Sequence, residues 1–206
     1  MSLLERFIDA TARKPAGWFG RAMYREAASH RHGFERIKET LALQAHEKVL
    51  EVGCGGGVLL EEMLAQCQNA CAIDHSADMV ALAMTRNAAA AAAGRLDLRQ
   101  GDAHALPWPD ASCNAAVSAH MFFFIEHPRK MLQEICRVLK PGGRLVMATC
   151  PHSRLGGWLL APYARAMHCY TDEELAAMLR ACGFAEARAH TETRLLQLAW
   201  ARKPGE

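Results

Sequence analysis

The sequence predicts an α/β fold: a single doubly wound, mostly parallel seven-stranded sheet whose last strand is antiparallel, preceded by N-terminal helices. Two observations predict this class. Short apolar runs alternate with helix-forming segments, as in a parallel sheet that helices cover on both faces. The apolar run 49–52 also leads through four glycines, at positions 53, 55, 56 and 57, into the helix-forming residues 58–62. A strand that turns over glycines into a helix leaves bare backbone and a helix N-terminus for a ligand.

Composition narrows the class of protein. The 206 residues are enough for one domain with a substantial core. The net charge is only +2, so the sequence indicates neither nucleic acid nor an anionic membrane as a partner. Charges at Glu5, Arg6 and Asp9 interrupt the apolar N-terminus, and no run has the length of a spanning helix. We expect a cytoplasmic protein, a monomer or homodimer, without stable membrane association.

Cysteine and histidine spacing argues against a metal site. The eight cysteines include no C-x-x-C pair and lie mostly among apolar residues, which favours free structural thiols. The ten histidines show no H-E-x-x-H or comparable spacing. We therefore expect no bound metal.

The elements follow in order as one predicted domain, 1–206. Residues 1–46 are expected to form helices that act as a lid or substrate region, 47–150 the cofactor-binding core, and 151–206 a helix and a closing hairpin. Within the core, short apolar runs predict strands, and segments with helical propensity predict helices. The expected strands are 48–52, 70–74, 96–100, 115–119 and 144–149, and the expected helices are 58–66, 77–93 and 128–139.

Turn and cap residues set several of these boundaries. Gly94 is expected to end the alanine-rich helix 77–93 as its C-cap. The stretch 141–143, Pro-Gly-Gly, is expected to be a turn before the fifth core strand. Thr171 and Glu174 have the spacing of a capping box, and Gly183 is expected to stop the helix that they begin. Residues 185–190 and 194–201 are expected to pair as an antiparallel hairpin.

Three strand ends carry carboxylates: Glu51, Asp74 and Asp102. In doubly wound sheets the ligand binds outside the carboxyl ends of the strands, so these side chains should converge. The glycines do not fit the dinucleotide pattern G-x-G-x-x-G, because its third glycine position falls on Val58 or on Leu60. A shorter nucleoside-bearing ligand without a pyrophosphate is the better match.

Four segments in sequence carry a family resemblance. They are 49–57 with the glycine turn, 73–79 with Asp74, 101–107 with Asp102, and 137–145 with Pro-Gly-Gly. In this order and spacing the chain resembles the class I S-adenosylmethionine-dependent methyltransferases, particularly the type 11 branch that includes quinone-biosynthesis enzymes. The resemblance implies a Rossmann-like methyltransferase fold, S-adenosyl-L-methionine as cofactor and S-adenosyl-L-homocysteine as product.

The resemblance also implies roles for individual residues. Glu51 and the glycine backbone would hold the methionine end, and Asp74 would accept hydrogen bonds from both ribose hydroxyls. His75 and Met79 would flank the adenine, and Asp102 and the Ala103 amide would meet its edge. The implied cofactor set is Glu51, Gly53, Cys54, Gly55, Asp74, His75, Met79, Asp102, Ala103 and Ser118.

Plainer interpretations remain open at several of these positions. Asp74 could cap the following helix, and Asp102 could be a turn residue. His75 could be a solvated side chain, and Met79 could belong to the core.

The substrate side is expected at the end of the strand 115–119. The aromatic and methionine run after it indicates an apolar pocket, although half of those side chains must face the core. His120 is the candidate catalytic residue, as proton acceptor or substrate contact, with a structural histidine as the alternative. Family members often carry a histidine where Phe124 stands, so no base is carried over there. The candidate substrate-binding residues are Tyr24, His120, Phe122, His168 and Tyr170.

The predicted function is methyl transfer to an O, N, S or C nucleophile of a small molecule. The sequence Asn-Pro-Pro-Tyr is absent, which argues against N-methylation of DNA or of release factors. Two alternatives stay open: a non-catalytic protein of the same fold that binds the cofactor or serves as a scaffold, and an NAD-dependent oxidoreductase.

Overall fold

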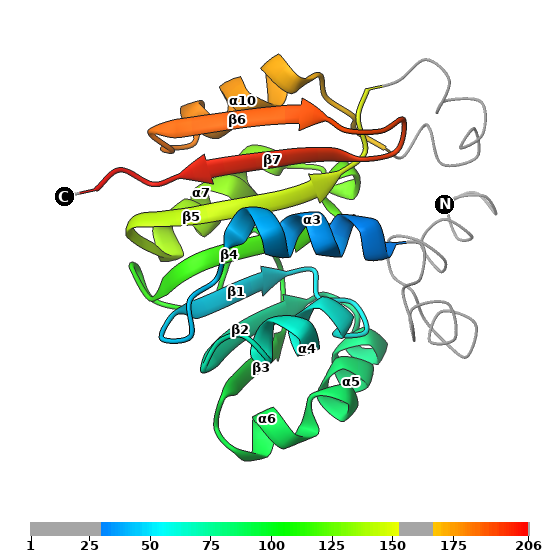
Figure 1. Ribbon diagram of the computed structural model, residues 1–206, viewed down its shortest axis with the longest axis vertical. Coiled ribbons are helices and arrows are strands. Elements are labelled where there is room, and N and C mark those ends of the chain that lie inside the picture. The colour runs from blue at the N-terminus through cyan, green and yellow to red at the C-terminus, as the bar shows by residue number, and fades with distance from the viewer. Residues whose placement is uncertain (1–29, 153–166, 206) are drawn as a thin grey trace.

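A computed structural model describes residues 30–152 and 167–205, and one seven-stranded sheet runs through them (Figure 1). The strand order is β3-β2-β1-β4-β5-β7-β6. Neighbours pair in parallel except at β7, which is antiparallel to both β5 and β6. The prediction of a mostly parallel sheet with an antiparallel last strand is confirmed. The strands are β1 (Lys48–Val52), β2 (Asn69–Asp74), β3 (Leu96–Gln100), β4 (Cys113–Ala119), β5 (Leu139–Thr149), β6 (Glu186–Thr191) and β7 (Gln197–Arg202).

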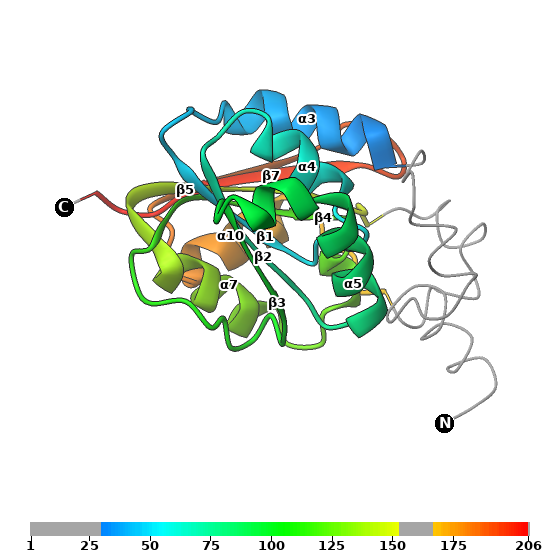
Figure 2. The same cartoon turned by 90° about the horizontal axis from the view of Figure 1, so that it is seen from below.

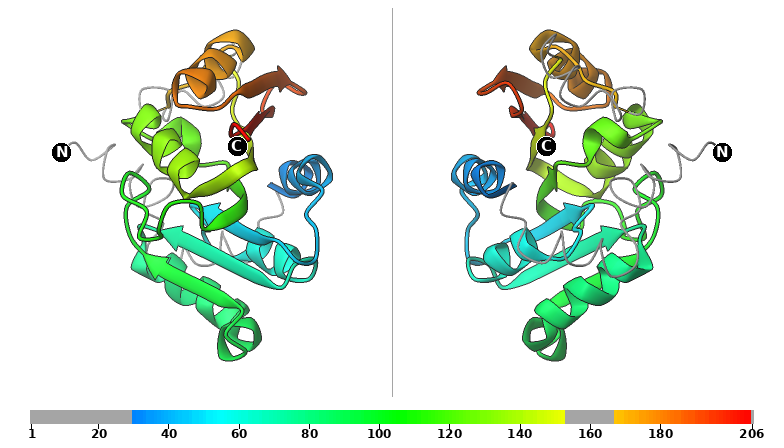
Figure 3. Two further views of the ribbon diagram at one scale, coloured as in Figure 1. Left: turned by 90° about the vertical axis from the view of Figure 1, so that its left-hand side faces the viewer. Right: turned by 90° about the vertical axis from the view of Figure 1, so that its right-hand side faces the viewer.

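Helices cover both faces of this sheet (Figures 2 and 3). On one face lie α3 (Arg31–Leu41), α4 (Val58–Leu64), α5 (Ala77–Arg86) and α6 (Ala88–Ala92), and on the other lie α7 (Pro128–Val138) and α10 (Asp172–Ala181). Buried side chains alternate along the central strands between the two faces. In β5, Val146 and Ala148 belong to the core under α3 and α4, whereas Leu145 and Met147 belong to the core under α7 and α10. The sheet is therefore buried on both sides, as its apolar strands predict.

The expected single helix 77–93 is wrong: the structure has two helices, α5 and α6, joined at Asn87. The Asn87 side chain is buried, and its Nδ2 donates to Gly57 O at 3.2 Å and to Ala83 O at 3.0 Å. This side chain ties the helix to the glycine turn and supplies the physical reason for the interruption. Gly94 ends the segment with a positive φ of 70°, as expected.

The fifth core strand also begins earlier than expected. β5 starts at Leu139 and contains Pro-Gly-Gly as an irregularity, where the register against β4 shifts between Cys113 and Ala115. Gly142 has a φ of +72°, which favours glycine. The expected turn at 141–143 is therefore a bulge inside the strand rather than a turn before it.

The C-terminal elements follow the sequence pattern closely. At the start of α10, Thr171 Oγ1 accepts from Glu174 N at 3.2 Å, and Glu174 Oε2 accepts from Thr171 N at 2.9 Å. This is the predicted capping box. The strands β6 and β7 form the predicted antiparallel hairpin. Most of the predicted lid, residues 1–46, lies outside the described residues. Of this segment the structure describes only residues 30–46, which include α3. Within the described part, no helix has the length and apolarity to cross a membrane.

Candidate active site

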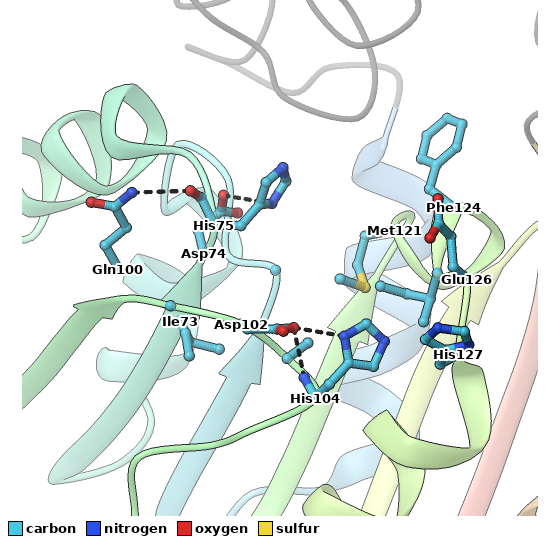
Figure 4. Close-up of a pocket in the computed structure, with 14 residues that line it drawn as sticks. Ile73, Asp74, His75, Gln100, Asp102, His104, Met121, Phe124, Glu126 and His127 are labelled. Carbon is cyan, nitrogen blue, oxygen red and sulfur yellow. Dashed lines mark hydrogen bonds and ion pairs between the residues drawn. The ribbon is translucent and has the colours of Figure 1, made fainter.

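A cleft of about 700 Å³ opens at the carboxyl ends of β1, β2 and β3, beside the loop that follows β4 (Figure 4). Five residues of the predicted cofactor set line it together: Gly53, Asp74, His75, Asp102 and Ala103. The strand ends thus converge as the topology predicts.

The glycine turn between β1 and α4 is held in a conformation that requires glycine. Gly53, Gly55 and Gly57 have φ values of 78°, 49° and 76°. A Cβ at Gly53 would lie 2.6 Å from Met121 Cγ, across the cleft wall. A Cβ at Gly57 would lie 2.9 Å from the backbone of Ala83. The turn therefore requires glycine at these positions, because a side chain would strain its backbone and collide with the residues around the cleft.

Asp74 braces this turn at the end of β2. Its side chain is buried, with Oδ2 accepting from Gly55 N and Oδ1 from Ser76 N, both at 2.9 Å. The helix cap itself is Ser76, whose hydroxyl accepts from Met79 N. His75 Nδ1 lies 3.5 Å from Asp74 Oδ1, and its side chain is 40% exposed at the cleft. Each carboxylate oxygen of Asp74 keeps a lone pair beyond its backbone bond, so the group can still accept from a ligand.

Glu51 and Ser118 bring two unsatisfied polar atoms to neighbouring strand ends. Glu51 is 2% exposed, and neither its Oε2 nor Ser118 Oγ has a hydrogen-bond partner among the described residues. Glu51 on β1 pairs with Val117 on β4, so Ser118 follows the residue opposite Glu51 and its side chain lies on the other face of the sheet. Burial, and then the charge of Asp74, raise the pKa of Glu51 well above its usual range. A buried carboxyl group without a partner is costly unless a ligand satisfies it.

Asp102 lies at the opposite wall of the cleft, after β3. Its Oδ1 accepts from His104 N at 2.9 Å and lies 2.6 Å from His104 Nδ1 (Figure 4). The backbone hydrogen bond from His104, followed by its side-chain bond, lowers the pKa of Asp102. The Asp102 side chain remains 67% exposed, so it is ionised and accessible to a ligand in the cleft.

Other predicted site residues do not line the cleft. Met79 and Phe122 are fully buried in the core, and Cys54 is buried beside the glycine turn. Tyr170 packs against Phe122 with ring centroids 6.0 Å apart. His168 is exposed, and its N donates to Phe123 O at 2.7 Å. Tyr24 lies outside the described residues.

His120 lies between the end of β4 and α3, away from the cleft lining. Its ring stacks on His30 with centroids 4.3 Å apart, and its backbone φ is +55°. A Cβ at Gly33 would lie 2.4 Å from His120 Nε2, which is buried and has no hydrogen-bond partner among the described residues. Burial, and then the charge of His30, lower the pKa of His120 to about 3. His120 is therefore neutral near neutral pH, and its catalytic role stays a prediction.

Several residues that line the cleft were not predicted from the sequence. His104 follows the Gly-Asp-Ala stretch, and Glu126 and His127 follow the aromatic run. Their position just after predicted site segments was the available signal. Among the described residues, no group of three or more histidine, cysteine, aspartate or glutamate side chains could hold a metal ion. The remaining lining residues are Ile73, Gln100, Gly101, Met121, Phe124 and Ile125.

A nucleoside that carries an ammonium group fits this arrangement of the glycine turn and three carboxyl groups, those of Glu51, Asp74 and Asp102. Glu51 offers a buried acceptor for a cation, and Asp74 offers free lone pairs at the glycine turn. Asp102 offers an accessible acceptor across the cleft. The residues present therefore suit the methionine, ribose and adenine parts of S-adenosylmethionine.

Comparisons with known proteins agree with this arrangement. A family model described as "Methyltransferase domain" matches residues 50–147. A demethylmenaquinone methyltransferase of Paenarthrobacter aurescens is 30% identical over 122 residues, which are 59% of this chain and 46% of that protein. A ubiquinone/menaquinone biosynthesis C-methyltransferase of Roseobacter denitrificans is 33% identical over 120 residues, 57% of this chain and 48% of that protein. The match thus spans about half the length of these relatives.

Solved structures share the fold at lower identity. A phosphoethanolamine N-methyltransferase of Haemonchus contortus, solved with S-adenosylhomocysteine, has a TM-score of 0.71 at 16% identity, covering 84% of this chain and 52% of that one. The cyclase SpnF has a TM-score of 0.68 at 21% identity, covering 85% and 82%. Since a cyclase has the same fold, the fold alone does not determine the reaction.

Fold, glycine turn and matched sequence together define a class I methyltransferase domain. Over residues 50–147 the chain matches the type 11 branch of the S-adenosylmethionine-dependent methyltransferases.

Proposed function

We propose that this chain transfers a methyl group from S-adenosylmethionine to a small, apolar acceptor bound in the cleft. The observation that carries the proposal is the convergence of three carboxylates on the glycine turn and its cleft. Asp74 and Asp102 line the cleft, and the unsatisfied Glu51, whose pKa the charge of Asp74 raises, lies near the end of β1. No dinucleotide glycine pattern accompanies this turn, which disfavours the oxidoreductase alternative.

The protein's own groups explain how the cofactor would be held. When bound, the cofactor supplies an electrophilic methyl group on a sulfonium centre. Glu51 would pair with its ammonium group, Asp74 would accept from the ribose hydroxyls, and Asp102 with the Ala103 amide would meet the adenine edge. The transferred group carries no developing anion that needs an oxyanion site, so alignment of the acceptor is the main task of the cleft.

We place the acceptor beside the loop that follows β4. Met121, Phe124 and Ile125 give this part of the cleft an apolar lining, and Glu126 and His127 of the same loop also line it. Two relatives are named for quinone biosynthesis, so we propose an aromatic ring acceptor such as a demethylated quinol as the first substrate to test. Of the three imidazoles that line the cleft, we propose that His104 or His127, whose ring centroids lie 5.9 Å apart, takes up a proton from such a ring.

The test combines binding and turnover with the full chain. Calorimetry should show binding of S-adenosylhomocysteine and none of NAD. Incubation with methyl-labelled S-adenosylmethionine should then transfer label to a demethylated quinol with a shortened side chain, or to another apolar component of a cell extract. Cofactor binding without transfer to any acceptor would favour the non-catalytic alternative. Binding of NAD without binding of S-adenosylhomocysteine would overturn the proposal altogether.

A further inference from the structure

Two cysteines face each other where β5 ends. Cys150 follows β5 directly, and Cys169 lies in the segment that leads to α10. The next residue of each segment, Pro151 and Tyr170, forms a parallel bridge, and His152 N donates to Tyr170 O at 3.2 Å. In parallel pairing, the residues one step before a bridged pair are also opposite each other, with their side chains on the same side. Cys150 and Cys169 occupy these positions.

This placement suits a disulfide. Opposed residues on neighbouring strands lie about 4.8 Å apart, and a disulfide spans Cα atoms that are about 4.4–6.8 Å apart. Interaction between the two thiols lowers the pKa of Cys169 and raises the pKa of Cys150. Cys169 is also the more accessible of the two, being partly exposed whereas Cys150 is buried.

We propose that Cys150 and Cys169 are a redox modification site, at which a peroxide oxidises the pair to a reversible disulfide. A partly exposed thiol of lowered pKa beside a second thiol is the arrangement in which such oxidation occurs. The bond would join the end of β5 to the segment before α10 and fix the backbone of His168 and Tyr170, which flank Cys169. The proposal stands apart from methyl transfer, because it depends only on the two thiols.

The chemistry balances with the peroxide as the two-electron oxidant. The Cys169 thiolate attacks one peroxide oxygen: an S–O bond forms, the O–O bond breaks, and the leaving oxygen departs as water or an alcohol after taking a proton. The Cys150 sulfur then attacks the sulfenic sulfur of Cys169. The S–S bond forms, the S–O bond breaks, and hydroxide leaves as water with the proton of the Cys150 thiol. A dithiol reductant reverses the reaction by thiol–disulfide exchange.

A second thiol pair provides an internal comparison. The thiols of Cys71 and Cys113 also shift each other's pKa, but both are fully buried, on strands β2 and β4 that β1 separates in the sheet. Peroxide has no access to these sulfurs in the folded protein. We therefore expect this pair to stay reduced under conditions that oxidise Cys150 and Cys169.

The experiment uses the full reduced chain, freed of reductant and treated with limiting hydrogen peroxide. Remaining thiols are alkylated, and the digest is analysed by mass spectrometry. We expect a linked peptide that contains Cys150 and Cys169, the loss of two of the eight alkylatable thiols, and their recovery after dithiothreitol. The Cys150→Ser variant should leave a sulfenic acid on Cys169 that dimedone traps, and the Cys169→Ser variant should give neither product. Cys67→Ser, a buried cysteine distant in sequence from both, should keep the link.

Three results would overturn the proposal. The first is no linked peptide while other cysteines are oxidised, and the second is a link that forms only after denaturation. The third is a Cys71–Cys113 link at an equal rate. Circular dichroism of each variant separates loss of the link from loss of the fold.

Discussion

The carboxyl groups that we propose hold the cofactor differ in how many hydrogen bonds the protein itself gives them. Asp74 already accepts two backbone hydrogen bonds, whereas Glu51 keeps an oxygen without a partner among the described residues. Under the proposed assignment, removing Asp74 would disturb both the glycine turn and ligand binding, whereas changing Glu51 would mainly affect ligand binding. The two residues need different tests.

For Asp74 we expect the Asp74→Asn and Asp74→Ala variants to bind S-adenosylhomocysteine more weakly. Loss of hydrogen bonds to a charged group costs about 1.5–3 kcal/mol, which is roughly ten- to hundredfold in dissociation constant. Calorimetry at fixed pH measures the change in dissociation constant. Asp78→Asn, in the first turn of α5, is the control that should bind S-adenosylhomocysteine as the parent does. An unchanged affinity in both Asp74 variants would refute the ribose assignment.

For Glu51 the expected signature is a dependence of binding on pH. In the free protein, burial and then Asp74 raise the pKa of Glu51, so its carboxyl group holds a proton at pH values where an ordinary glutamate is ionised. An ammonium group needs the carboxylate, so affinity should fall as pH falls through that raised pKa. Glu51→Gln should weaken binding and remove this part of the pH dependence.

The same shift predicts the stability of the cofactor-free protein. A raised pKa in the folded state contributes stability that is lost as pH rises through it. Glu51→Gln should therefore unfold at a higher denaturant concentration than the parent above that pH. Glu61→Gln, an exposed change on α4, should show neither effect. Parallel pH profiles for the parent and Glu51→Gln would contradict the assignment.

At the scale of elements, α3 packs closely against the sheet at Gly33. Gly33 faces the His120 ring, and the Arg144 guanidinium ties the other end of the helix to β5 by donating to Leu41 O at 2.7 Å. A Cβ on Gly33 would lie 2.4 Å from His120 Nε2 and 3.5 Å from Ala148 Cβ, so the glycine lets α3 approach both side chains closely. Helix position and histidine position are thus coupled.

This coupling predicts that Gly33→Ala lowers the free energy of unfolding of the parent protein but raises that of the His120→Ala variant. Alone, Gly33→Ala places a Cβ against His120 Nε2, and such overpacking costs about 1–3 kcal/mol. In a His120→Ala background the obstacle is gone, and the same change should stabilise the protein by up to about 1 kcal/mol through helix propensity. Urea unfolding of the four proteins measures the cycle. Equal effects of Gly33→Ala in both backgrounds would show that helix and histidine are independent.

Element positions were largely predictable from the sequence, and the exceptions have physical causes. Apolar runs and carboxylates at strand ends were enough to locate the sheet and the Asp74–Asp102 edge of the cleft. The break at Asn87 was not predictable, because it depends on a contact with Gly57 thirty residues away. The direction of His120 was not predictable either, since its left-handed backbone turns the ring away from the aromatic loop toward α3. His104 was missed because its role depends on the fold of the loop around Asp102.

At the scale of the whole molecule, a ligand that binds only the folded state must stabilise it. S-adenosylhomocysteine at a hundred times its dissociation constant should add about 2.7 kcal/mol to the free energy of unfolding. For a domain of this size, each kcal/mol raises the thermal midpoint by roughly 2–4 °C. Differential scanning fluorimetry should show this shift with S-adenosylhomocysteine and none with NAD, and a smaller shift in Asp74→Ala at the same concentration. No shift for the parent at saturating ligand would contradict the cofactor assignment.

The order of the strands has a consequence for how the chain is made. β6 is joined to the sheet through β7 alone, yet β7 is synthesised after it. When residues up to Thr191 have left the ribosome, the strands from β1 to β5 have their neighbours in the sheet, but β6 has none to pair with. Docking of β6 must wait until Gln197–Arg202 leaves the exit tunnel. Nascent chains stalled before that point should pair five strands and leave the sixth exposed to proteases and chaperones.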